Sequence, residues 1–235
     1  MTSVGIHHGS SAAWRPAVSG TLLKTLLVSG ILSSLIYVAI DLVSASRYPG
    51  YSLVNQAISE LSAIEAPAAS ASLWKWLGPI YGSLFMGFTI GVLRAARGNR
   101  ALRRSGWIML AFIGWGMLWP FFPMHQRGTE TTVSDLGHII LGGGSSVLIL
   151  GFIGFGAFAL GNRFRNWSLA TMLVYFLTAL GTFSYVNEVV AGDSTPWLGI
   201  IERIMIYAYL LWVAVLAVAL LLRDREGGSS GITTA

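Results

Sequence analysis

The sequence predicts an all-α integral membrane protein, built as a bundle of six transmembrane helices. Three observations lead to this fold class. First, 54% of the 235 residues are hydrophobic and only 11% are charged, whereas about 25% of the residues of an ordinary soluble domain are charged. Second, the mean hydropathy is +0.66. Third, six apolar segments reach the length of about 20 residues that a membrane span requires, which leaves no room for a soluble catalytic domain.

The predicted spans are joined by short, more polar connections. They cover residues 22–44, 74–94, 105–123, 136–160, 168–190 and 197–222. The first is expected to be a retained helix, because its apolar run exceeds the roughly 7–15 residues of a signal peptide. The membrane domain is therefore predicted to be 22–222. The segments 1–21 and 223–235 are rich in Ser, Gly and Thr and are predicted to be disordered tails.

The distribution of charge predicts the orientation of the bundle. Segments on the side of the N-terminus carry 11 of the 15 Lys and Arg residues but only two of the ten acids. Basic residues are enriched in cytoplasmic loops, so we expect both termini in the cytoplasm and the protein in the cell membrane. Because these basic residues flank spans, no nucleic-acid partner is expected. The absence of cysteine excludes disulfides, thiolate metal sites and cysteine nucleophiles.

The first span ends in a polar stripe, in which Asp41 lies one turn after Tyr37. The connection that follows, YSLVNQAISELSAIEAP at residues 51–67, has apolar residues at helical spacing. This pattern predicts a short amphipathic helix on the outer surface. Such a helix would turn Asn55 or Glu60 toward the bundle.

The second and third spans carry signals for packing and termination. Gly87 and Gly91 are four residues apart, a spacing that allows close packing of helices. The third span ends in WPFFP at residues 119–123, where two prolines stop the helix and Trp119 favours the membrane interface. His125 follows at once, so we expect it near the membrane surface.

The fourth span opens with a helix start signal. Thr132 and Asp135 match the [ST]-x-x-[DE] capping pattern ahead of an apolar run, which predicts a structural role for Asp135. His138 lies one turn later. It is either a buried histidine with satisfied hydrogen bonds, or a group for acid-base chemistry or ligand binding.

The fifth and sixth spans bring further ionisable residues to the same side. Glu188 lies at the end of the fifth span, and the sixth begins after Pro196. Glu202 and Arg203 then lie about 9 Å into this helix at 1.5 Å per residue. Adjacent helical residues point about 100° apart, so these two need not pair, and Arg203 shares a face with Tyr207. A structural ion pair is the alternative to a functional role.

These polar residues come from the outer ends of the spans, so a compact bundle would gather them in a polar pocket. We expect His138 or His125 to act as general acid or base. Glu202 or Glu188 would be its partner, and Arg203 would hold an anionic head group. The residues expected to bind substrate are Arg203, Asp41, Asn55, Glu60, Trp119 and Tyr207. Only two histidines lie outside the N-terminal tail, so a metal site would need an acid as third ligand, and we predict no metal and no other cofactor.

Three motifs in this order resemble a known family. YSLVNQAISELSA, FPMH with a downstream TTVSDLGH, and GIIERI are similar to motifs of the bacterial six-helix membrane proteins grouped as domain of unknown function 998. The resemblance covers about residues 22–222. It implies the six-helix fold and a shared polar site, whereas the family name assigns no activity.

Two functions fit these observations. The first is a membrane-embedded enzyme that uses His and carboxylate groups on a lipid or isoprenoid substrate entering from the bilayer. The second is a non-catalytic protein for lipid binding, transport or assembly, which would use the same residues for recognition. In either case we expect a membrane lipid or hydrophobic small molecule as the partner, and protein partners are left open.

Overall fold

A computed structural model describes residues 20–229, and the side chains of residues 20–223. The described part of the chain contains helices and no strands, which confirms the all-α fold. The elements are α1 (Gly20–Ser46), the 3₁₀ helix η1 (Ile58–Ser62), α2 (Ala68–Ala96), α3 (Arg100–Gly116), the 3₁₀ helix η2 (Trp119–Phe121), α4 (Val133–Ala157), α5 (Asn162–Ser184), α6 (Val186–Ala191) and α7 (Leu198–Ser229). The predicted tails lie mostly outside the described residues, and residues 223–229 continue α7.

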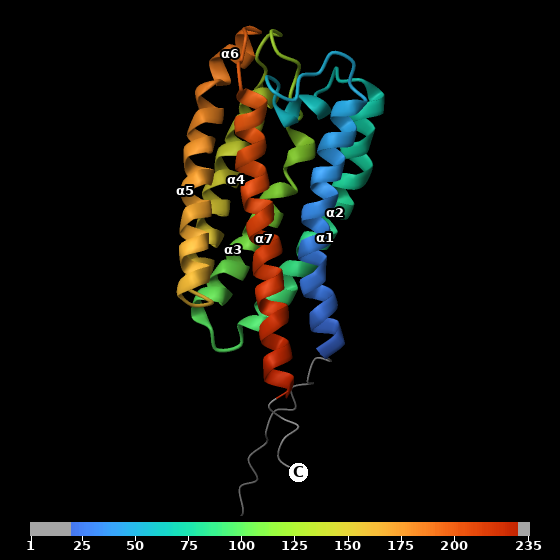
Figure 1. Cartoon of the computed structure of the whole chain (residues 1–235). Helices are drawn as coiled ribbons and strands as arrows, with labels where there is room; N and C mark the ends of the chain where they lie inside the picture. The colour runs from blue at the N-terminus through green and yellow to red at the C-terminus, as the bar shows by residue number, and fades with distance from the viewer. Residues whose placement is uncertain (1–19, 230–235) are drawn as a thin grey trace, which may run out of the picture.

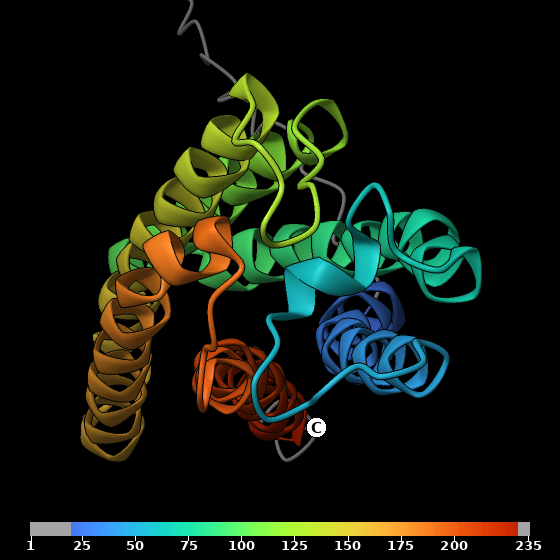
Figure 2. The ribbon, with the colours of Figure 1, turned by 90° about the horizontal axis from the view of Figure 1, so that it is seen from above.

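The long helices run up and down along one axis (Figure 1). Each packs against the next from α1 to α5, and α7 packs against both α5 and α1 and so closes the bundle. One end holds the α2–α3 and α4–α5 turns together with both ends of the described chain. We call it the terminal end. The other is the capped end, covered by segments 47–67, 117–132 and 192–197 (Figure 2).

Five helical segments are long and apolar enough to cross a membrane: α1, α2, α4, the α5–α6 segment, and α7 as far as Arg223. The remaining predicted span, 105–123, corresponds to α3, which has 17 residues and ends at Gly116. Pro120 explains this early end, because a proline has no N–H to bond the carbonyl four residues earlier. The chain continues instead through η2. The protein is therefore an all-α membrane bundle in which α3 is the shortest of the six long helices.

Two predictions about local packing can be compared with the structure. A Cβ at Gly91 would lie 3.1 Å from the Cβ of Leu26, so small residues on α2 do allow close contact with α1. The predicted amphipathic helix is present as the five-residue η1, in which Ile58 is buried. It is shorter than the pattern implied, and Ile64 lies outside it with 52% of its surface exposed.

The core lies between α2, α4 and α7. It is built from large aromatic side chains that include Phe85, Phe152, Tyr209 and Trp212. Near the terminal end, Gly156 allows α4 to approach α7, because a Cβ there would lie 2.6 Å from the Trp212 ring. The core thus fixes the rotation of each helix about its own axis, and with it the direction in which the polar residues point.

Candidate functional site

One buried ion pair of the capped end joins α1 and α7. The Asp41 side chain is fully buried, and Arg203 is 6% exposed. Arg203 Nε and Nη2 donate to Oδ2 and Oδ1 of Asp41 at 3.0 and 2.8 Å, and the Tyr207 hydroxyl donates to Oδ2 at 2.6 Å. Burying a charge is costly unless the charge is paired and hydrogen-bonded. Arg203 and Tyr207 together meet this requirement for Asp41.

Arg203 also holds the connection after α1 in place. Its Nη1 donates to the backbone carbonyls of Leu53, Gln56 and Gly199 at 3.0–3.3 Å. Its Nη2 donates to the Tyr51 hydroxyl at 3.0 Å, and burial raises the pKa of this tyrosine. Every guanidinium nitrogen therefore has a protein acceptor. An anionic ligand at Arg203 would have to replace one of these contacts.

A second ion pair joins the three segments of the capped end. Arg127 Nε donates to Oε2 of Glu60 at 2.8 Å, and its Nη2 donates to Oε1. Arg127 Nη1 reaches the Thr195 hydroxyl at 3.0 Å. Hydrogen bonding to Glu60, opposed by partial burial, raises the pKa of Arg127. Glu60 is 3% exposed and also accepts from the backbone N–H of Ala57, so its charge is compensated on several sides.

Asn55 is part of the same set of links. Its side-chain oxygen accepts from the backbone N–H of Trp197 at 3.2 Å, and its backbone carbonyl accepts from the Thr195 hydroxyl at 2.6 Å. Segment 117–132 is further tied to the segment before α2, because the Gln126 N–H donates to Glu65. These contacts fasten the covering segments to one another and to the start of α7.

The two histidines lie where segment 117–132 meets α4. His125 Nδ1 is 3.1 Å from Oδ2 of Asp135, and Asp135 also accepts from the N–H and hydroxyl of Thr132. This confirms the predicted helix start at Thr132. His138 Nδ1 lies 3.1 Å from the Phe122 carbonyl, and its ring stands edge-on to Trp119. Among the described residues, neither histidine uses Nε2 in a hydrogen bond.

The predicted partner carboxylates do not contact these histidines. Glu202 is partly buried, and its Oε2 accepts from the backbone N–H of Ile58 at 2.6 Å. Glu188 has a buried Oε2 with no hydrogen-bond partner. The carboxylate that pairs with His125 is Asp135, to which the sequence assigned only the capping role. Three ion pairs form among the described side chains, and none includes Glu202 or Glu188.

The structure adds two aromatic residues that the sequence argument did not place in the site. The Trp74 ring is edge-on to Tyr37 at 5.2 Å and packs against the cluster formed by Ala45, Ile58 and Leu61. Its indole N–H is buried without an acceptor. One signal for this location was present in the sequence, where Tyr37 lies one turn before Asp41. The direction of Trp74 depends on how α2 is rotated against α1, which no pattern within α2 specifies.

The described residues contain no group of three His, Cys, Asp or Glu side chains placed to hold a metal ion. The arrangement at the capped end thus offers unused acceptors and donors: a Glu202 oxygen, the Glu188 Oε2 atom, the two histidine Nε2 atoms and the Trp74 indole N–H. All of these groups can form hydrogen bonds with a polar head group, and the carboxylates and imidazoles can also transfer a proton.

Fold and site together define a multi-pass, all-α membrane protein with ion-paired segments over one end. The chain belongs to the family described as "Protein of unknown function (DUF998)", whose sequence model matches residues 31–219. This confirms the resemblance drawn from the three motifs, and the match includes all three ion pairs. No curated protein and no solved structure matches the chain significantly.

Proposed function

We propose that this protein binds a membrane lipid or another hydrophobic molecule through its polar head at the capped end, and that Glu202 receives the head group. The observation that carries the proposal is the difference between Glu202 and its neighbours. Asp41 and Glu60 each have a bidentate arginine partner, whereas Glu202 has one backbone hydrogen bond and no cation. An ionisable side chain in a membrane segment is expensive, and by default it marks a functional site.

Trp74 supports the same location. The backbone N–H of Ile58 binds Glu202, and the Ile58 side chain belongs to the cluster that Trp74 packs against. Trp74 and Glu202 therefore both lie beside the small cluster that contains Ile58. A hydroxyl group has both a donor and acceptor lone pairs. A ligand with hydroxyl groups would satisfy both protein groups, and buried polar groups without partners call for such an explanation.

Binding is favoured over catalysis because most residues of the predicted site form contacts that hold the covering segments in place. Asp41 and Arg203 join α1, α7 and segment 51–57, while Glu60 and Arg127 join the covering segments. In this proposal Asn55, Trp119 and Tyr207 support the walls of the site. With the predicted cytoplasmic termini, the ligand would enter from the extracytoplasmic leaflet of the cell membrane.

The second proposed function is an enzyme acting on a lipid or isoprenoid, and the histidines favour it. Their Nδ1 atoms are held by Asp135 and by the Phe122 carbonyl, which fixes the ring orientation and leaves Nε2 as the atom that can exchange a proton. His138 or His125 would then act as general acid or base. Glu188 and Glu202 would assist from across the site.

Mass spectrometry of the gently purified full-length protein tests the binding proposal. We expect a stoichiometric hydrophobic molecule on the wild type and an approximately tenfold lower retention in Glu202→Gln, because hydrogen bonds to a charged acceptor are the stronger ones. Glu130→Gln changes the same charge on an exposed loop residue and serves as the matched control. A wild type without any such molecule, or equal losses in both variants, would refute the proposal.

The same preparations separate binding from catalysis. Labelled lipid extracts are incubated with the wild type, His138→Ala and His125→Ala, and the products are followed by chromatography. A binding protein returns the lipid unchanged from all three. Turnover that either histidine variant abolishes would establish the enzyme and replace the first proposal.

A further inference from the structure

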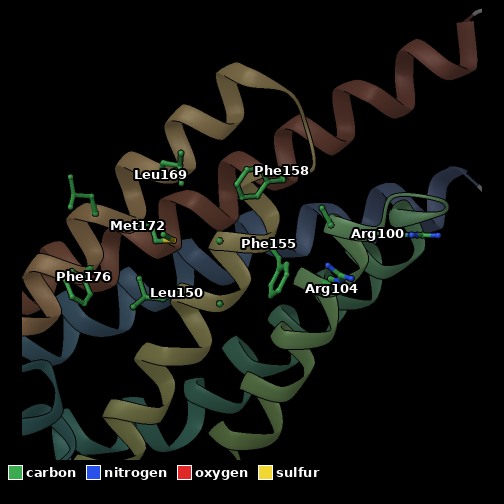
Figure 3. A pocket seen from close by; sticks show the side chains of 12 residues that line it. Arg100, Arg104, Leu150, Phe155, Phe158, Leu169, Met172 and Phe176 are labelled. Atoms are coloured by element: carbon green, nitrogen blue, oxygen red, sulfur yellow. The ribbon is translucent and has the colours of Figure 1, made fainter.

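A second site lies at the opposite end of the bundle, on the outer surface of α3, α4 and α5. These helices form an open groove of ≈ 820 Å³, within the range of about 300–1,000 Å³ that is usual for ligand pockets. Figure 3 shows its wall of Leu150, Leu169, Met172 and Phe176. Leu169 and Phe176 are 41% and 47% exposed, so the groove presents an apolar surface to its surroundings.

The groove is charged at one end only. Arg100 and Arg104 line it at the start of α3, which places them at the terminal end. The guanidinium of Arg104 lies 5.7 Å from the ring centre of Phe155, on the wall of the groove (Figure 3). Neither arginine pairs with a carboxylate among the described side chains. Among the described residues, two arginines without a carboxylate partner therefore lie at one end of the apolar groove.

Two glycines of α4, Gly151 and Gly154, line the floor of the groove. A Cβ at Gly151 or Gly154 would make only ordinary contacts, at 3.5 Å from Ile108 and from Met172. Packing of α4 against its neighbours therefore does not require glycine there, although glycine is less favourable than alanine inside a helix. At Gly144 and Gly156, by contrast, a Cβ would collide with a tryptophan ring. The space above Gly151 and Gly154 is available for an occupant.

The dimensions and charge point to one kind of occupant. The wall on α4 runs from Leu150 to Phe158, about 12 Å at 1.5 Å per residue, which is close to the depth of one leaflet of a hydrocarbon core about 30 Å thick. Basic residues beside membrane helices attract anionic lipids, by about 1 kcal/mol for each charge. We propose that this groove binds an anionic phospholipid, with its phosphate at Arg100 and Arg104 and an acyl chain along α4 and α5.

Native mass spectrometry of the full-length protein with equal amounts of phosphatidylglycerol and phosphatidylcholine, with identical acyl chains, tests this proposal. We expect the wild type to retain about tenfold more phosphatidylglycerol. The double variant Arg100→Gln/Arg104→Gln should lose the preference. Arg103→Gln, an exposed arginine on the same helix that does not line the groove, should keep it.

A second variant acts through shape rather than charge. Gly154→Leu fills the floor and should lower retention of both lipids several-fold, so it tests the site even if the double arginine variant does not fold. Equal retention of the two lipids by the wild type would overturn the proposal. So would an equal effect of Arg103→Gln and the double variant, or a dimer in which a second copy occupies the groove.

Discussion

Replacing Arg203 by methionine would remove the cation that compensates the fully buried Asp41 carboxylate. Breaking a buried pair by removing one partner costs about 3–5 kcal/mol, because the remaining charge is left without compensation. For a chain of this size, each kcal/mol lowers Tm by about 2–4 °C. We therefore expect Tm to fall by roughly 6–20 °C.

The double variant Asp41→Leu/Arg203→Met distinguishes the uncompensated charge from the lost anchoring of segment 51–57. Removing both charges at once leaves no uncompensated charge between α1 and α7, so this variant should be more stable than Arg203→Met alone. It should still be less stable than the wild type, because the carbonyls of Leu53 and Gln56 lose their donor. Without such anchoring, segment 51–57 should also be cleaved faster in limited proteolysis.

The assay is thermal unfolding of the purified protein in one detergent at a fixed scan rate, followed by tryptophan fluorescence. Arg103→Met, at an exposed position, is the control and should change Tm by about 2 °C or less, because surface substitutions usually change stability by about 0.5 kcal/mol or less. The reasoning would be refuted if Arg203→Met lowered Tm no more than the control. It would also fail if the double variant were less stable than Arg203→Met.

Three further predictions use the same unfolding assay. Arg127→Gln leaves the buried Glu60 without its cation and should cost about 2 kcal/mol, together with faster proteolysis of segment 117–132; unchanged cleavage would contradict this. Thr132→Ala removes the α4 cap and should cost about 1 kcal/mol, whereas the neighbouring Thr131→Ala should be neutral. Gly156→Ala should cost about 1–3 kcal/mol through its contact with Trp212, while Gly154→Ala should be neutral or stabilising. Equal effects of the two glycine variants would show that the contact with Trp212 does not limit packing.

The sequence by itself determined the fold class and several of its local features. Apolar segments long enough to span a membrane can satisfy their backbone hydrogen bonds only as helices or closed barrels, so length and composition suffice to predict the helical bundle. The start of α4 at Thr132 and a stop of the third helix at the prolines of segment 119–123 follow from groups within a few residues of each other, although α3 ends earlier than predicted, at Gly116. Such local signals can be read without knowing how the helices pack.

The tertiary structure alone decided which polar groups meet. Asp41 and Arg203 are 162 positions apart in the chain, and the sequence placed both at one end without pairing them. Glu202 and Arg203 are neighbours on α7, yet Arg203 turns to α1 while Glu202 turns to η1. The rotation of each helix is fixed by the aromatic core, and the paths of the covering segments are fixed by contacts between them. Both depend on the packing of several helices at once, so no pattern within a single segment could specify them.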